Sequence, residues 1–267
     1  MKVGPSWGAG LLWPAGAYLA LQILVSGLAL AGGVVDVVSL GAAEALVYLG
    51  AIALLLWRHE RGTLLRSALG LRPTHPALAF VGIGLGASLK LPAEALTRVI
   101  ERFFPTDDAQ LVARAALYRT DTLSDVARLL SVTCVVAPLV EELFFRGALY
   151  GRLAKSNAVG AAFVTGFAFV IVHSDARHWP ALFLVAAVLG FLRVTSGSLL
   201  PCLGLHVAFN ALGVLTLVTG AASATRPLEI SGGLLLVSWL LAALLFWAAR
   251  RLATDPDVIR ARAEDRA

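Results

Sequence analysis

The sequence predicts an all-α membrane protein, a single bundle of about eight transmembrane helices. Of its 267 residues, 58% are hydrophobic and only 15% are charged, and the mean hydropathy is +0.81. These values lie far from the composition of a soluble globular domain. Long apolar windows recur along the chain, and each approaches the length that crosses a hydrocarbon core of about 30 Å. The windows lack the alternation of barrel strands, so we expect helices.

Eight windows of roughly 18 to 25 apolar residues are the candidate spans. In chain order they cover residues 11–31, 40–57, 77–96, 129–153, 158–174, 181–195, 199–220 and 230–247. Lys90 and Glu94 interrupt the third window, and the sixth is short. The first window could be read as a secretory signal ending near Ala31, but its apolar run is longer than a usual signal core. We therefore treat residues 1–267 as one polytopic domain.

One long polar connection, residues 97–128, separates the third and fourth windows. Its apolar residues fall at the spacing of two amphipathic helices, one before Pro105 and one after it. Helices of this kind lie along a membrane interface. We expect them to form a surface cap on the bundle, and the alternative is a gate.

The distribution of Lys and Arg predicts the orientation, because cytoplasmic loops of membrane proteins are enriched in basic residues. With both termini on one side, fourteen basic residues fall on that side and seven on the other. We therefore expect cytoplasmic termini, with residues 248–267 as a charged cytoplasmic tail. The bias accounts for the net charge of +5, and no basic patch with interleaved aromatic residues indicates a nucleic-acid partner. The excess of Arg over Lys is typical of GC-rich bacterial genomes, so the expected location is the bacterial cytoplasmic membrane.

Ionisable residues inside the predicted spans are the main functional signal, because charge is costly at that depth. In the fourth window Pro138 precedes Glu141 and Glu142, and Arg146 follows Glu142 by four residues. About one helical turn separates Glu142 from Arg146, so these two can pair while Glu141 points elsewhere, rotated by about 100°. One carboxylate is then structural and the other is free for chemistry. The alternative is an ion network of all three that only fixes helix packing.

Two further windows carry polar pairs at the same four-residue spacing. Phe169 and His173 share one face of the fifth window, and His206 and Asn210 share one face of the seventh. Taken alone, His173 reads as an interfacial residue, and the second pair as an interhelical clasp. Three such clusters in nearby spans are better explained by one shared cavity, and we expect their polar groups to converge there.

The sequence resembles a known family at three ordered motifs. They are Glu-Glu-Leu-Phe-Phe-Arg-Gly at 141–147, Phe-Val-Ile-Val-His at 169–173 and His-Val-Ala-Phe-Asn at 206–210. The family is the CAAX prenyl endopeptidase and bacteriocin-processing superfamily (CPBP, also called Abi) of intramembrane proteases. The resemblance lies within residues 129–213, which we take as the catalytic motif core. It implies a helical bundle with a glutamate-dependent endopeptidase site inside it.

The resemblance also implies roles for individual residues. Glu141 matches the carboxylate that activates water, and Glu142 with Arg146 match its supporting partners. His173 matches the histidine that shares this water. These roles agree with general chemistry, because amide hydrolysis needs a base to activate water.

His206 and Asn210 match the pair that stabilises the oxyanion, and a carboxamide is a neutral donor of the kind found in oxyanion holes. No cofactor is then needed. A zinc-dependent version stays open, because His173, His206 and Glu141 are also a catalytic zinc ligand set. The chain has no His-Glu-x-x-His signature, which favours the metal-free route.

The predicted function is an intramembrane endopeptidase that cuts a membrane-anchored protein or peptide near its membrane-embedded or C-terminal end. Prenylated CAAX tails give the family its name, but a bacterium has few of them, so a C-terminal anchor or a leader peptide is the expected substrate class. One alternative is a non-enzymatic bacteriocin-immunity or scaffold protein. Another is a solute transporter with a carboxylate proton relay, which would predict inverted-repeat halves that the sequence lacks.

Overall fold

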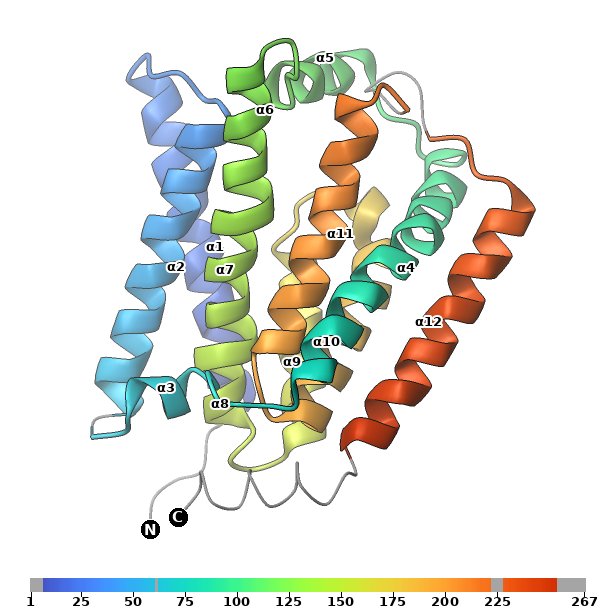
Figure 1. The fold of residues 1–267 in the computed structure, drawn as a ribbon. Coiled ribbons are helices and arrows are strands. Elements are labelled where there is room, and N and C mark those ends of the chain that lie inside the picture. Colours follow the sequence, from blue (N-terminus) through green and yellow to red (C-terminus); the bar gives the residue numbers. More distant parts are fainter. Residues whose placement is uncertain (1–6, 61, 222–227, 254–267) are drawn as a thin grey trace.

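The fold is a bundle of long helices, seen in a computed structural model that describes residues 7–60, 62–221 and 228–253 (Figure 1). All regular structure within these ranges is helical. Seven of the described helices are long and apolar enough to cross a membrane, and an eighth is apolar but shorter. The predicted all-helical membrane bundle of about eight helices is therefore confirmed.

The helices run up and down the bundle in chain order, as Figure 1 shows. Their bounds are α1 (Trp7–Leu30), α2 (Val37–His59), α3 (Leu65–Ala68), α4 (Pro76–Glu101), α5 (Asp108–Leu117), α6 (Leu123–Leu130), η1 (Ser131–Val136), α7 (Ala137–Glu142), η2 (Leu143–Leu149), α8 (Tyr150–Leu153), α9 (Ala158–Ile171), η3 (Ala176–His178), α10 (Trp179–Ser196), α11 (Leu200–Val218) and α12 (Gly232–Ala253). The start of α1 and the end of α12 lie at the same end of the bundle as α3, and α5 and α6 lie at the opposite end.

Two of these helices differ from the windows expected from hydropathy. Helix α12 continues to Ala253, so the start of the expected tail over residues 248–267 is helical. Arg250 and Arg251 lie in its last turn, where basic side chains interact favourably with the helix dipole. The remainder of the tail lies outside the described residues. Helix α9 ends at Ile171 and has only 14 residues, so His173 lies in the loop beyond it.

The fourth span is one continuous helix interrupted by two π-helical segments, η1 and η2, on either side of α7. Pro138 has no backbone N–H, which breaks the ladder of helix hydrogen bonds just after η1. π turns are rare and occur often at functional sites. Here they flank the short helix that carries Glu141 and Glu142.

Helices α4 and α11 pack closely because glycines face the contact. A Cβ atom at Gly82 or Gly86 would lie 2.2 Å from the carbonyl oxygen of Pro201 or Leu205, respectively. Small residues four apart allow this close approach between membrane helices. The contact fixes the helix that carries His206.

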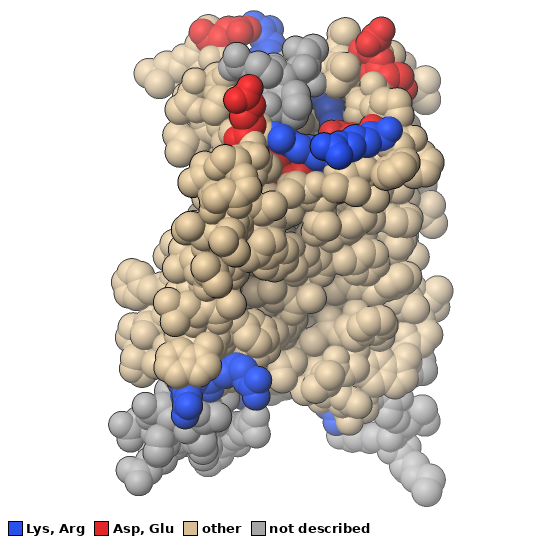
Figure 2. Space-filling model, turned by 90° about the vertical axis from the view of Figure 1, so that its right-hand side faces the viewer, with Lys and Arg blue, Asp and Glu red and all other residues tan. Residues whose placement is uncertain are grey.

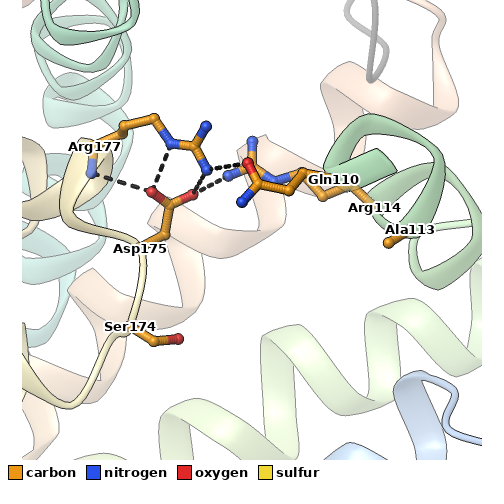
Figure 3. Close-up of a pocket in the computed structure, with 6 residues that line it drawn as sticks. All are labelled: Gln110, Ala113, Arg114, Ser174, Asp175 and Arg177. Carbon is orange, nitrogen blue, oxygen red and sulfur yellow. Dashed lines mark hydrogen bonds and ion pairs between the residues drawn. The ribbon is translucent and has the colours of Figure 1, made fainter. Parts of the chain in front are cut away.

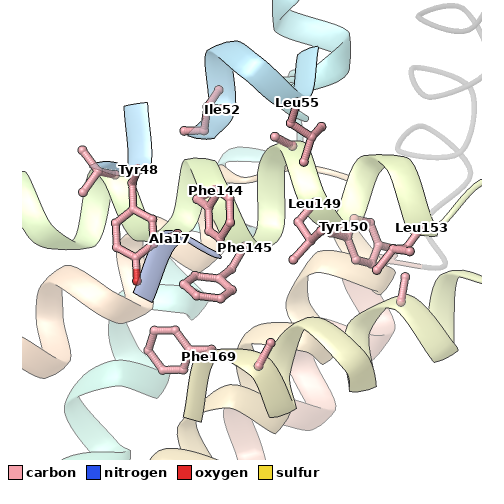
Figure 4. Packing of buried hydrophobic residues seen from close by; sticks show 14 of the residues in the cluster. Ala17, Tyr48, Ile52, Leu55, Phe144, Phe145, Leu149, Tyr150, Leu153 and Phe169 are labelled. Atoms are coloured by element: carbon pink, nitrogen blue, oxygen red, sulfur yellow. The ribbon is translucent and has the colours of Figure 1, made fainter. Parts of the chain in front are cut away.

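The continuous helix formed by η1, α7 and η2 is called the motif helix below. An aromatic cluster packs it against its neighbours (Figure 4). Phe144 and Phe145 of η2 lie 4.9 Å apart between ring centroids, and Tyr48 of α2 lies 5.0 Å from Phe144. Phe169 of α9 meets Phe145 edge to face at 5.4 Å. The rings are buried, so they hold α2, η2 and α9 at fixed spacing around the polar residues.

Charged residues gather at the two ends of the molecule on the face shown in Figure 2, with a wide uncharged band between them. This pattern suits a protein that crosses a membrane. The structure corrects the count of basic residues, because Arg146 and Arg193 are buried within the bundle, at 1% and 6% exposure. Both were assigned to cytoplasmic segments in the sequence count.

Candidate active site

Glu142 is the fixed carboxylate of the site. Its Oε1 atom accepts a hydrogen bond from Nη1 of Arg146 at 3.0 Å and lies 2.9 Å from Nδ1 of His206. Glu142 is fully buried. An ionised carboxylate only accepts hydrogen bonds, so Nδ1 of His206 carries the hydrogen. The Nε2 atom of that imidazole is left to face Glu141.

Glu141 lies between two imidazole rings. Its Oε2 atom is 3.5 Å from Nε2 of His206, and its Oε1 atom is 3.9 Å from Nε2 of His173. The second imidazole is also fixed in tautomer, because Nδ1 of His173 lies 2.7 Å from the carbonyl oxygen of Phe169, which can only accept. Both histidines therefore present Nε2 to the same carboxyl group.

The loop after α9 holds His173 in this position. The indole Nε1 of Trp179 donates to the carbonyl oxygen of His173 at 2.7 Å. The ring of Phe169 lies 4.7 Å from the His173 ring and 5.9 Å from the His206 ring. The guanidinium carbon of Arg146 lies 4.3 Å from its centroid, a cation–π distance. Phe169 thus contacts both histidines and Arg146.

Each π segment frees a carbonyl group that another helix uses. Asn210 of α11 donates Nδ2 to the carbonyl oxygen of Thr133 in η1 at 2.7 Å. Arg193 of α10 donates Nε to the carbonyl oxygen of Arg146 in η2 at 2.7 Å. One Nδ2 hydrogen of Asn210 therefore ties α11 to η1, and its carboxamide has a second hydrogen to donate.

Sequence reasoning missed one carboxylate that reaches this cluster. The carboxyl group of Glu44, on α2, lies within hydrogen-bonding reach of Glu141 and near both histidines. Its signal was present, because Glu44 is an ionisable residue inside the second predicted span. It has no motif around it, whereas the other site residues lie in pairs at helical spacing.

A cavity of about 440 Å³ lies beyond His173, at the end of the bundle where α5 is found (Figure 3). Its lining residues come from α5 and from the loop after α9, and they are Gln110, Ala113, Arg114, Ser174, Asp175 and Arg177. Asp175 pairs with Arg114 and accepts from Nε of Arg177 at 2.7 Å. This network ties α5 to the loop that carries His173.

The Asp175 carboxylate is strongly held in its ionised form. Burial raises its pKa, but hydrogen bonds from the side chain and backbone of Arg177 outweigh burial and lower the pKa to about 2. The carboxylate therefore stays charged at every physiological pH, and protonation of Asp175 does not weaken the link between α5 and the loop in that range.

The donor atoms around Glu141 bear on the zinc alternative. Among the described residues, no three His, Cys, Asp or Glu side chains group as metal ligands would. In the zinc alternative the ligands would be Glu141, His173 and His206, and the carboxylate oxygens of Glu141 lie 3.5 and 3.9 Å from the two Nε2 atoms. Chelation of the purified enzyme tests this alternative.

Comparison with known proteins identifies the family of the motif core. Residues 124–212 match the family described as type II CAAX prenyl endopeptidase Rce1-like. This match supports the CPBP/CAAX protease family for the chain. The resemblance found in the three motifs is thereby confirmed, and the matched region contains all six residues proposed from them. Glu44 lies outside it.

Comparisons with individual proteins and with solved structures give two further results. An uncharacterized 24.3 kDa protein of Escherichia coli is 30% identical over 147 residues, which is 52% of this chain and 59% of that protein. This chain therefore matches less than two thirds of its relative. No solved structure matches the chain.

Proposed function

We propose that the chain is an intramembrane endopeptidase of the CAAX type that uses a glutamate to activate water. One observation carries the proposal. Glu142 is occupied by Arg146 and His206, whereas Glu141, beside it in sequence, faces the Nε2 atoms of His173 and His206. Two adjacent carboxylates thus have different environments, which is how a site separates a structural group from a reactive one.

The hydrolytic water is proposed to bind between Glu141 and His173. Their facing atoms are 3.9 Å apart, too far for a direct hydrogen bond and suited to a bridging water. Glu141 takes a proton from this water as its oxygen attacks the peptide carbonyl carbon. The same proton passes from Glu141 to the departing nitrogen as the C–N bond breaks.

The negative charge on the carbonyl oxygen is proposed to be stabilised by Asn210 and His206. Asn210 would use its second Nδ2 hydrogen, because the first is bonded to Thr133. His206 would donate from Nε2 as an imidazolium, which the Glu142 carboxylate stabilises through Nδ1. Buried, preorganised donors of this kind are the usual means of stabilising an oxyanion.

The substrate class follows from the position of the site inside the bundle. We propose a membrane-anchored protein or peptide, cut near its membrane-embedded or C-terminal end, in the bacterial cytoplasmic membrane. The cavity next to His173 opens at the α5 end, which is extracytoplasmic if both termini are cytoplasmic. A C-terminal anchor or a leader peptide that reaches this end suits the arrangement better than a cytoplasmic prenylated tail.

The test is cleavage by the purified full-length chain in proteoliposomes. Two probes are offered, a single-span peptide with a C-terminal anchor and a farnesylated CAAX peptide, and the products are identified by mass spectrometry. We expect the anchored peptide to be cut and Glu141→Gln to be inactive. Failure to cut either probe would contradict the proposal and favour a scaffold protein. Equal cutting by Glu141→Gln would contradict the glutamate mechanism.

A further inference from the structure

Helix α2 lies along the motif helix on the side where Glu141 is found. At one point of this contact, Gly41 approaches the side chain of Val132, where a Cβ atom would lie 2.4 Å from Cγ1. At another, Tyr48 packs on Phe144 and Phe145. Glu44 is three residues after Gly41 and four before Tyr48, so it lies on the same face between these two contacts. The packing of α2 therefore directs Glu44 into the bundle.

The contact between the two carboxyl groups is specific. Glu44 is half-buried, and its carboxyl group lies within hydrogen-bonding reach of that of Glu141. Two ionised carboxylates cannot hydrogen-bond, because neither has a donor, so a hydrogen bond between them needs one shared proton. The other titratable side chains near Glu44 are those of His173, His206, Tyr48 and Tyr118. No basic side chain forms a salt bridge with Glu44 among the described residues.

We propose that Glu44 is a positioning residue for the reaction proposed above, and that its protonated carboxyl group donates a hydrogen bond to Glu141. The inference rests on the proposed function and adds a third carboxyl group to the site. The donor keeps the negative charge of the pair on Glu141 and fixes its carboxylate between the two imidazoles. During hydrolysis Glu44 keeps its proton, and Glu141 alone takes a proton from water and returns it to the leaving nitrogen.

The proposed donor role predicts different effects for two substitutions of Glu44. Glu44→Gln keeps a donor at nearly the same place, because its carboxamide can donate to Glu141, whereas Glu44→Ala removes the donor. We expect kcat to fall on the order of 10- to 100-fold in Glu44→Ala, the scale of a lost hydrogen bond to a charged group, with KM unchanged. In Glu44→Gln, kcat should stay within about threefold. Leu46→Ala, at an exposed position on α2, is the matched control and should leave both constants unchanged.

A second measurement does not depend on activity. The infrared spectrum of the wild-type protein at neutral pH should contain the band of a protonated carboxyl group, and this band should vanish in Glu44→Gln. A band that persists in Glu44→Gln, or equal loss of kcat in the Gln and Ala variants, would overturn the proposal. Unchanged kcat in Glu44→Ala would also overturn it. If the band behaves as expected while the wild-type protein cuts no probe, the carboxyl pair stands and the proposed protease function fails.

Discussion

Two carboxylate–arginine networks in this protein use the same chemical groups in different surroundings. In the inner network, Glu142 pairs with Arg146 at 0% and 1% side-chain exposure. In the outer network, Asp175 pairs with Arg114 and Arg177, and Asp175 is 30% exposed. Removing charges from water costs several kcal/mol per ion in the first case and little in the second. The buried pair lies beside Glu141 and His206, whereas the partly exposed pair holds the loop that carries His173.

The inner network is also less complete in its hydrogen bonds. Oε2 of Glu142 and Nη2 of Arg146 are buried and have no hydrogen-bond partner among the described residues. Unsatisfied buried groups are unfavourable and are retained at functional sites more often than elsewhere. The outer Asp175, in contrast, receives donors on both oxygens. The difference predicts that substitutions in the inner network affect catalysis and folding strongly, and that substitutions in the outer network affect stability weakly.

The largest effect should come from Glu141→Gln, which keeps the shape of the side chain and removes the base. We expect turnover to fall by about 10²- to 10⁴-fold, the scale of a lost general base. The unfolding temperature in detergent should stay near the wild-type value, because Glu141 is not the partner of Arg146. Cleavage kinetics and thermal unfolding on the same preparation measure both. A variant that unfolds as readily as one lacking Arg146 would remove the distinction between the two glutamates.

Arg146→Met should have the next largest effect, this time on stability. It leaves the buried Glu142 with only His206 as a partner, and breaking a buried ion pair in this way costs about 3–5 kcal/mol. The double variant Glu142→Gln with Arg146→Met is the matched control, because it leaves no uncompensated charge and should recover part of the loss. Thermal unfolding in detergent measures both. Equal unfolding temperatures for wild type and Arg146→Met would show that the inner pair is not costly to break.

Asn210→Ala should slow turnover by about 10²- to 10³-fold through loss of an oxyanion donor, with substrate binding retained. The structure adds a second expectation, because the same side chain bonds the carbonyl group of Thr133. Asn210→Asp is the matched control, since it preserves the size of the side chain but replaces the amide donors. A rise in KM without a fall in kcat would make Asn210 a structural clasp between α11 and η1.

In the outer network, Asp175→Asn should cost about 1 kcal/mol, because the group is partly exposed and its interactions are screened. The direction of the pH dependence follows from the pKa of Asp175, which is about 2 and lies below its ordinary value of 3.8. The ionised form stabilises the folded protein above the ordinary value, and this contribution is lost as the pH falls through about 2. The difference in unfolding temperature between wild type and variant should therefore be full at neutral pH and shrink below about pH 4. A difference that grows on acidification would contradict this pKa.

Removal of metal ions should have no effect on turnover. We expect cleavage to survive strict chelation, because Glu141, the two imidazoles and Asn210 supply base, partner and donors by themselves. The assay adds chelator to the purified enzyme and then restores zinc. Activity that vanishes with chelator and returns with zinc would make Glu141, His173 and His206 metal ligands.

Hydropathy predicted the helical bundle well, because a span is a long-range average over many residues. It placed the end of α12 too early, since the Ala-Ala-Arg-Arg run after Trp247 is a good helix former without being strongly apolar. The π segments around α7 were not predicted, because no composition distinguishes them from an α-helix. The buried position of Arg193 was missed for a related reason, since a sequence count cannot separate a basic residue in a loop from one inside the bundle.

Within the site, spacing predicted the pairing of Glu142 with Arg146, because both lie on one helix. The contacts between helices were harder to predict from the sequence. The bond from His206 to Glu142 joins residues 64 positions apart, and the contact between Glu44 and Glu141 joins two different halves of the chain. The bond of Asn210 to Thr133 depends on a carbonyl group that only the π segment frees. Tertiary geometry of this kind is not encoded in any local pattern.

The shortness of α9 has a consequence for how a hydrolase can work inside a bilayer. Its 14 residues rise only about 21 Å, against a hydrocarbon core of about 30 Å. Beyond its end lie the polar loop that carries His173 and the cavity that this loop shares with α5. In the proposed hydrolysis each peptide bond cut consumes one water molecule, and a short α9 followed by a polar loop would shorten the path of that water through the hydrocarbon.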